Sequence, residues 1–81
     1  MIIEEIVLGK DVSSKQEAIR KNLGKEVILN DFHNRWCHGI VLGEKTDNMT
    51  YYINILSAIG EKRFYYSNLN QLLLLTPSQY G

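Results

Sequence analysis

The chain has 81 residues, of which 44% are hydrophobic and 22% charged, as is typical of one folded domain and not of a disordered segment. Nine basic and nine acidic residues cancel, so no long-range field attracts the chain to duplex DNA or to an anionic membrane. The single cysteine excludes an intrachain disulfide, and no apolar stretch approaches the roughly 20 residues of a membrane-spanning helix. These features predict a cytoplasmic protein without a membrane partner.

Residues 1–12 are predicted to be extended. Ile2, Ile6 and Leu8 alternate with Glu4, as they would on one face of a strand. The apolar residues of this region also fit one face of a helix. Isoleucine and valine are stiff at χ1 and pack well on a pleated surface, which favours the strand.

Residues 13–77 are predicted to form a short helix followed by a small β-barrel. Ser13 and Ser14 are each followed three positions later by glutamine or glutamate, the spacing of a capping box, so either serine could begin the helix. Ile19 supplies the apolar face, and Gly24 stands where a helix ends in a left-handed residue. A helix this short needs a partner surface.

Five strands follow, separated by polar turns; they are predicted at 26–29, 35–44, 50–58, 62–66 and 72–75. The second strand alternates, with Trp36 on one face and Cys37 on the other. Gly39 and Gly43 share a side, and such glycines often mark the place where a small barrel bends.

A single 3₁₀ turn is expected at 67–70, because serine and asparagine compete for local backbone hydrogen bonds. The four leucines at 72–75 imply that both faces of the last strand are covered. One cover would be the barrel, and the other the helix, residues 1–8 or another subunit. Pro77 ends the strand, and residues 78–81 are predicted to be a flexible tail.

Six aromatic residues fall on three consecutive predicted strands, so those on one face would be neighbours. We expect Tyr51 and Phe64 in the core. Trp36 is expected to be exposed together with at least one of the remaining three tyrosines, which are Tyr52, Tyr65 and Tyr66. An exposed aromatic platform can stack unpaired bases or anchor a peptide.

Three further residues complete the predicted binding set. Arg35 and Arg63 lie on or beside the aromatic strands, as does Lys62, and these bases could contact phosphate. Charges that protect a solvated sheet edge explain them equally well. Phe32 stands at a loop tip, where it would either contact a partner or fold over one end of the barrel.

The order of elements resembles that of Sm-like barrels, and the barrel part alone is similar to SH3-like barrels. The segment 64–70 is similar to the late tyrosine-containing segment of the bacterial Sm-like RNA chaperones, and 39–41 and 47–49 echo a second motif of that family. The resemblance implies a five-stranded small barrel that binds single-stranded RNA through Tyr65. Where that family has a Lys-His pair after the tyrosine, this chain has Tyr66 and Ser67.

No metal, cofactor or catalytic centre is predicted. His33, Cys37 and His38 are close in sequence, but they lack the paired spacing of a zinc site, and Cys37 and His38 point to opposite faces of a strand. No glycine-rich turn that could stabilise an oxyanion follows the cysteine.

The sequence therefore predicts a small non-catalytic binding module that engages a protein partner, or a second copy of itself, through an aromatic strand face. Single-stranded RNA is the alternative ligand. The predicted binding residues are Trp36, Tyr52, Tyr65, Tyr66, Phe32, Arg35 and Arg63.

Overall fold

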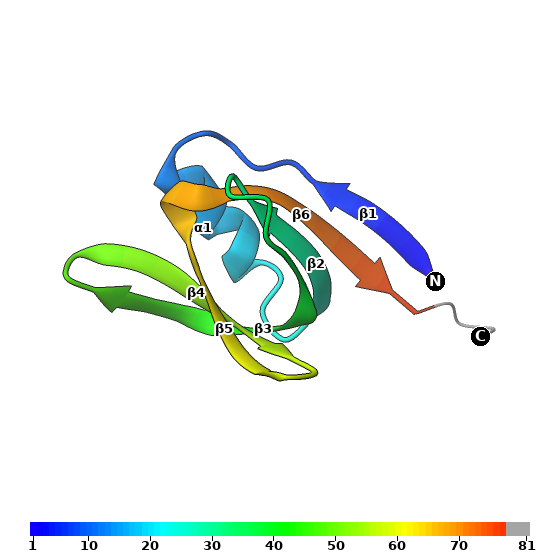
Figure 1. The fold of residues 1–81 in the computed structure, drawn as a ribbon. Helices are drawn as coiled ribbons and strands as arrows, with labels where there is room; N and C mark the ends of the chain where they lie inside the picture. The colour runs from blue at the N-terminus through cyan, green and yellow to red at the C-terminus, as the bar shows by residue number, and fades with distance from the viewer. Residues whose placement is uncertain (78–81) are drawn as a thin grey trace.

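The computed structural model describes residues 1–77; the tail predicted at 78–81 lies outside the described residues. Within that range the chain forms strands, an α-helix and a 3₁₀ turn (Figure 1). In chain order these are β1 (Ile2–Ile6), α1 (Val12–Arg20), β2 (Glu26–Asp31), β3 (Trp36–Asp47), β4 (Thr50–Ser57), β5 (Gly60–Tyr65), η1 (Tyr66–Asn68) and β6 (Leu69–Thr76).

All the strands belong to one antiparallel sheet with the order β1-β6-β2-β3-β4-β5. The mainly β prediction is confirmed. The five predicted strands correspond to β2 through β6, and a 3₁₀ turn precedes the last of them as expected. The first residues add a sixth strand, β1, which pairs with β6 from Ile2 opposite Thr76 to Ile6 opposite Leu72.

The prediction of a closed barrel is wrong. β1 and β5 are the two ends of the sheet and do not pair with each other. The physical reason is that β1 occupies the outer side of β6, so the last strand already has β2 and β1 as neighbours. The leucine-rich strand is therefore an interior strand, and its outer edge is covered by this chain's own first residues. Two free edges remain on the sheet.

In Figure 1 the sheet curves and α1 lies against its hollow side. Ile19 of α1 is fully buried in a core with Val27, Leu29 and Leu72. Asp11, and not one of the predicted serines, caps the helix, because its carboxylate accepts hydrogen bonds from the Ser14 amide and hydroxyl at 3.0 and 2.7 Å. No helix in residues 1–77 has the length and apolar content that crossing a bilayer requires.

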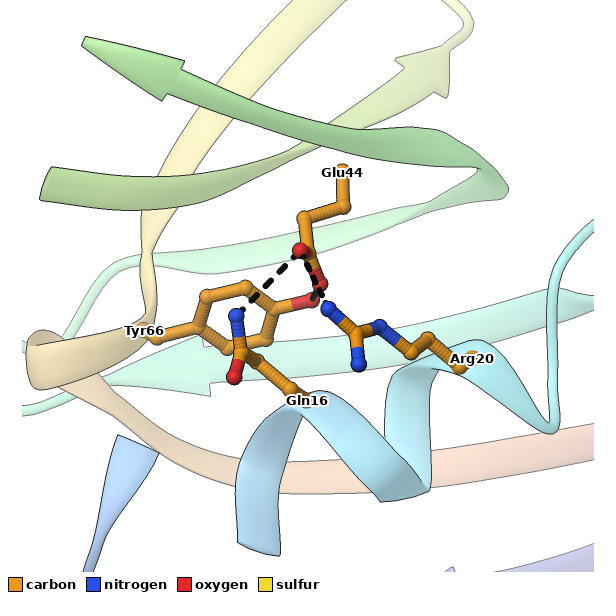
Figure 2. Close-up of polar contacts among 4 residues, drawn as sticks. All are labelled: Gln16, Arg20, Glu44 and Tyr66. Carbon is orange, nitrogen blue, oxygen red and sulfur yellow. Dashed lines mark hydrogen bonds and ion pairs between the residues drawn. The ribbon is translucent and has the colours of Figure 1, made fainter. Parts of the chain in front are cut away.

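A half-buried carboxylate joins α1, β3 and η1 (Figure 2). Glu44 accepts hydrogen bonds from the Tyr66 hydroxyl at 2.8 Å, from Arg20 at 2.8 Å and from Gln16 at 3.2 Å. Burial by itself would raise the pKa of Glu44, but the bonds from Arg20 and Tyr66 outweigh it, so the pKa lies below its ordinary value of 4.5. Burial and the bond to Glu44 raise the pKa of Tyr66, which keeps its proton.

This network corrects one predicted binding residue. Tyr66 was expected as a candidate for the exposed platform, but its ring is buried and its hydroxyl is held by Glu44. The buried amine of Lys15, on α1, donates to the backbone oxygen of Tyr66 at 2.9 Å and so holds the backbone of the same turn.

Candidate binding site: a groove along the free edge of β5

An open groove of about 780 Å³ separates the start of β3 from β5, with the β4–β5 turn at one end. Its lining consists of Arg35, Trp36, Cys37, His38, Ser57, Ala58, Ile59, Glu61, Lys62, Arg63 and Phe64. Four consecutive residues of β5, 61–64, border it. Because successive side chains of a strand point to opposite faces, a groove that meets all four runs along the edge of that strand. This is the edge that has no strand neighbour in the sheet.

The opposite wall also carries backbone that β4 does not pair. Trp36, Cys37 and His38 pair with β2, but the β3–β4 ladder begins only at Gly39 opposite Ser57. The groove therefore has strand backbone on both walls. Unpaired amide and carbonyl groups of this kind can form a ladder with an incoming extended segment.

Apolar side chains stand at the mouth and on the floor of the groove. Trp36 is 57% exposed and Ile59, on the β4–β5 turn, is 82% exposed. Phe64 is buried beneath them, and the Arg35 guanidinium lies 5.2 Å from the centre of its ring. The prediction that Phe64 is in the core and Trp36 is exposed is confirmed.

Asp31 fixes the loop that carries Arg35 and Trp36 to the groove. Its buried carboxylate accepts the amides of His33 and Arg35, each at 3.0 Å, and the Arg35 Nε at 2.6 Å. Burial by itself would raise the pKa of Asp31, but these bonds outweigh it and hold the pKa below 3.8. Asn34 takes the left-handed conformation, with φ 61°, that lets the loop turn back within reach of Asp31.

Replacing Asp31 with asparagine is expected to destabilise the chain by about 2 kcal/mol, because the amide NH₂ cannot accept from Arg35 and one side of the buried network stays unpaired. Urea unfolding and the emission of Trp36 measure the loss of stability and of loop order. The control is Asp47→Asn, whose partner Arg63 lies at 3.5 Å with both side chains about half exposed. That control should cost under about 0.5 kcal/mol; equal losses in the two variants would contradict the role given to Asp31.

The basic residues of the groove differ in how far their charge is already satisfied. Arg35 pairs with Asp31, and Arg63 pairs with Asp47 while lying 4.2 Å from the centre of the Tyr52 ring. Lys62 forms no ion pair with any residue in 1–77. The groove therefore offers one unpaired cation and two that would have to exchange partners.

The structure brings three predicted binding residues, Arg35, Trp36 and Arg63, to this groove. Tyr52 and Tyr65 do not line the groove; their ring centres lie 5.4 Å apart. Tyr52 is buried and Tyr65 half-buried. Phe32 is exposed at the loop tip, where its ring centre lies 5.7 Å from the Lys15 amine, and it does not line the groove. Sequence reasoning missed Ile59.

Tyr51, expected in the core, is exposed, and its neighbour Tyr52 is buried instead. The register of the β3–β4 ladder shifts between Val41 and Gly43. The extra residue at this shift, Leu42, lies in β3, so the faces of β4 are not exchanged. Tyr51 shares a face with the buried Ile53 and Ile55. It is exposed because it lies near the far end of the β3–β4 hairpin, opposite the exposed Thr46.

Cys37 is buried in the core, and His38 is exposed beside Glu26. Burial raises the pKa of the Cys37 thiol, although Lys62 nearby acts in the opposite sense. His38 Nε2 contacts the Glu26 carboxylate across the β2–β3 pair. Among residues 1–77, no three His, Cys, Asp or Glu side chains converge as metal ligands would.

A comparison of the chain with protein-family models, with curated proteins and with solved structures gives no match. The resemblance to Sm-like and SH3-like barrels stays a prediction. What the site can do is therefore argued from the geometry of the groove.

Proposed function

We propose that this chain is a small non-catalytic binding module that holds an extended segment of a protein partner in the groove along β5. The observation that carries the proposal is an exposed tryptophan, Trp36, beside a free strand edge. The edge supplies backbone hydrogen bonds, and the apolar mouth selects side chains. Tryptophan and arginine are the residues in which interface energy concentrates.

The surface around Trp36 favours a protein over a nucleic acid. Three outward positions of β3, Trp36, Ile40 and Leu42, are apolar where solvent would favour polar residues. Leu56 of β4, which pairs with Ile40, is also exposed. His38 separates Trp36 from the other apolar residues on this face. Two of the groove's three strong bases already have carboxylate partners, which reduces what they can offer to phosphate.

Single-stranded RNA is the second candidate, because Trp36 could stack a base while Lys62 and the two arginines contact phosphate. The two candidates differ in salt response. Affinity for RNA falls steeply as salt rises, since counterions are released from the phosphates. The affinity of a peptide bound through aromatic side chains and backbone hydrogen bonds changes little as salt rises.

The lack of activated chemistry in the groove supports a non-catalytic role. A nucleophilic cysteine needs a lowered pKa and a histidine partner. Cys37 has the opposite shift, and His38 is directed to Glu26 on the neighbouring strand.

The test uses Trp36, the chain's one tryptophan, as its own reporter. Short random peptides displayed on phage are selected on the immobilised chain, synthesised and titrated while Trp36 emission is followed. Trp36→Ala, read by calorimetry, is expected to weaken binding at least about tenfold. Met49→Ala, an equally apolar loss on the exposed β3–β4 turn, should leave binding unchanged.

Oligouridylate is titrated in parallel at low and high salt. Selected peptides that bind Trp36→Ala as tightly as the natural chain would overturn the proposal. Oligouridylate binding that is steeply salt-dependent and is lost in Trp36→Ala would favour the second candidate instead.

A further inference from the structure

We propose that the segment held in the groove is β1 of a second copy of this chain, so that copies join head to tail through their two free sheet edges. The inference rests on the proposed function, because it names the partner of the same groove. Its starting point is that one sheet ends in β1 on one side and in β5 on the other.

The two free edges carry complementary charges. The middle of β1 holds Glu4 and Glu5, and the middle of β5 holds Lys62 and Arg63, all four exposed. A two-residue acidic run and a two-residue basic run can be placed opposite each other whether the strands run parallel or antiparallel. Opposite charges on directly facing residues stabilise a strand pair, and like charges destabilise it.

The same charges act against symmetric pairing. Two β1 edges brought together would set glutamates against glutamates, and two β5 edges would set Lys62 and Arg63 against themselves. Two antiparallel β5 edges could also set Glu61 opposite Lys62, but Arg63 would then face Gly60. The mixed pair of β1 with β5 sets both glutamates of β1 opposite both bases of β5. Such an interface uses a different surface on each partner, so it generates a ring or an open chain and not a two-fold dimer.

The apolar residues of β1 fit the groove as well as its charges do. Ile2 and Ile3 are 61% and 60% exposed, although they lie on a strand of the sheet. In the antiparallel alignment that sets Glu5 opposite Lys62, Ile3 falls opposite Phe64. In a single copy these isoleucine side chains are in contact with water. Pairing would bury them against the apolar side of β5.

The existing contacts of these four residues are weak enough to exchange. Glu5 receives the Gln71 amide at 3.5 Å, and Arg63 meets Asp47 at 3.5 Å across an exposed surface. Lys62 forms no ion pair within residues 1–77. An incoming carboxylate would thus meet one free cation, Lys62, and one, Arg63, that also donates to the Tyr65 hydroxyl at 3.2 Å and lies over the Tyr52 ring.

A charge exchange between edges tests this directly. The first variant carries Glu4→Lys and Glu5→Lys; the second carries Lys62→Glu and Arg63→Glu. Each alone places like charges on both edges and is expected to be monomeric by light scattering where the natural chain assembles. Mixed in equal amounts, the two variants should assemble again, because each basic edge then meets an acidic one.

Controls separate assembly from folding. Circular dichroism checks that each variant is folded. If the double variant unfolds because Arg63 no longer lies over the Tyr52 ring, Lys62→Glu alone replaces it in the experiment. Reversing the exposed helical pair with Glu17→Lys and Lys21→Glu should leave assembly intact.

Three results would overturn the inference. They are a natural chain that stays monomeric at every concentration, assembly that survives either charge reversal, or folded variants that do not assemble when mixed. A monomeric chain whose binding of selected peptides still depends on Trp36 would remove only the self-association. A chain that assembles through these edges but binds no added peptide would show that the groove is reserved for β1.

Discussion

Replacing Gly39 with alanine is expected to destabilise this chain by about 3 kcal/mol, a large share of the stability of a domain this size. A Cβ on Gly39 would lie 2.6 Å from the Ile55 methyl group, and closer still to the backbone oxygen of Leu56. The colliding atom is backbone of the neighbouring strand, which cannot rotate away. β3 and β4 would have to separate at the point where their ladder begins.

Urea unfolding measures the effect, and the same strand offers its own control. A Cβ on Gly43 would meet nothing within 4 Å. Gly43→Ala is therefore expected to shift stability by less than about 0.5 kcal/mol. If the two alanine variants unfold at the same urea concentration, the close approach at Gly39 is not what holds β3 and β4 together.

Replacing Glu44 with alanine is expected to cost about 3 kcal/mol, because the buried Tyr66 hydroxyl and the Arg20 guanidinium lose their common acceptor. The variant also releases α1 from the sheet it covers. Glu17→Ala removes an exposed ion pair to Lys21, each side chain 71% exposed, and should be nearly neutral. Chemical unfolding of both variants at neutral pH is the measurement; a neutral Glu44→Ala would contradict the bridging role.

The same carboxylate makes stability depend on pH in a defined direction. The pKa of Glu44 is lower in the folded chain than its ordinary 4.5, so the unfolded chain binds the proton more readily. Its contribution is fully present above pH 4.5 and is lost as the pH falls through the folded value. Asp31 acts in the same sense below 3.8. Glu44→Gln should flatten the acid limb of the stability curve, and an unchanged limb would refute this assignment.

Most of the strands could be predicted from local pattern, because their apolar runs are separated by turn residues and their side chains alternate between two faces. Trp36, Ile40 and Leu42 are exposed and Val41 is buried, as that period requires. The inward face of β4 could be predicted for Ile53 and Ile55, but not for Tyr51, because its exposure depends on how far the β3–β4 hairpin extends past the core. The buried Lys15 likewise depends on a carbonyl 51 residues away in sequence.

The groove was only half predictable for the same reason. Arg35 and Trp36 directly follow a loop that could be predicted from the sequence, and arginine and tryptophan are residue types common in binding sites. Ile59 becomes part of the site because the β3–β4 ladder sets Ser57 opposite Gly39 and so places the β4–β5 turn beside the start of β3, a contact with no local signal. The prediction of barrel closure was wrong because closure depends on which strand pairs with the outer edge of β6, and in this chain β1 pairs there.

The pairing of Ile2 with Thr76 has a consequence for the order in which the sheet folds. β1 precedes every other element of residues 1–77, but its neighbour in the sheet, β6, follows all of them. Until β6 has been made, β1 has no strand with which to pair. Ladders between segments so distant in sequence also close slowly. We therefore expect the β1–β6 ladder to be one of the last parts of the sheet to form.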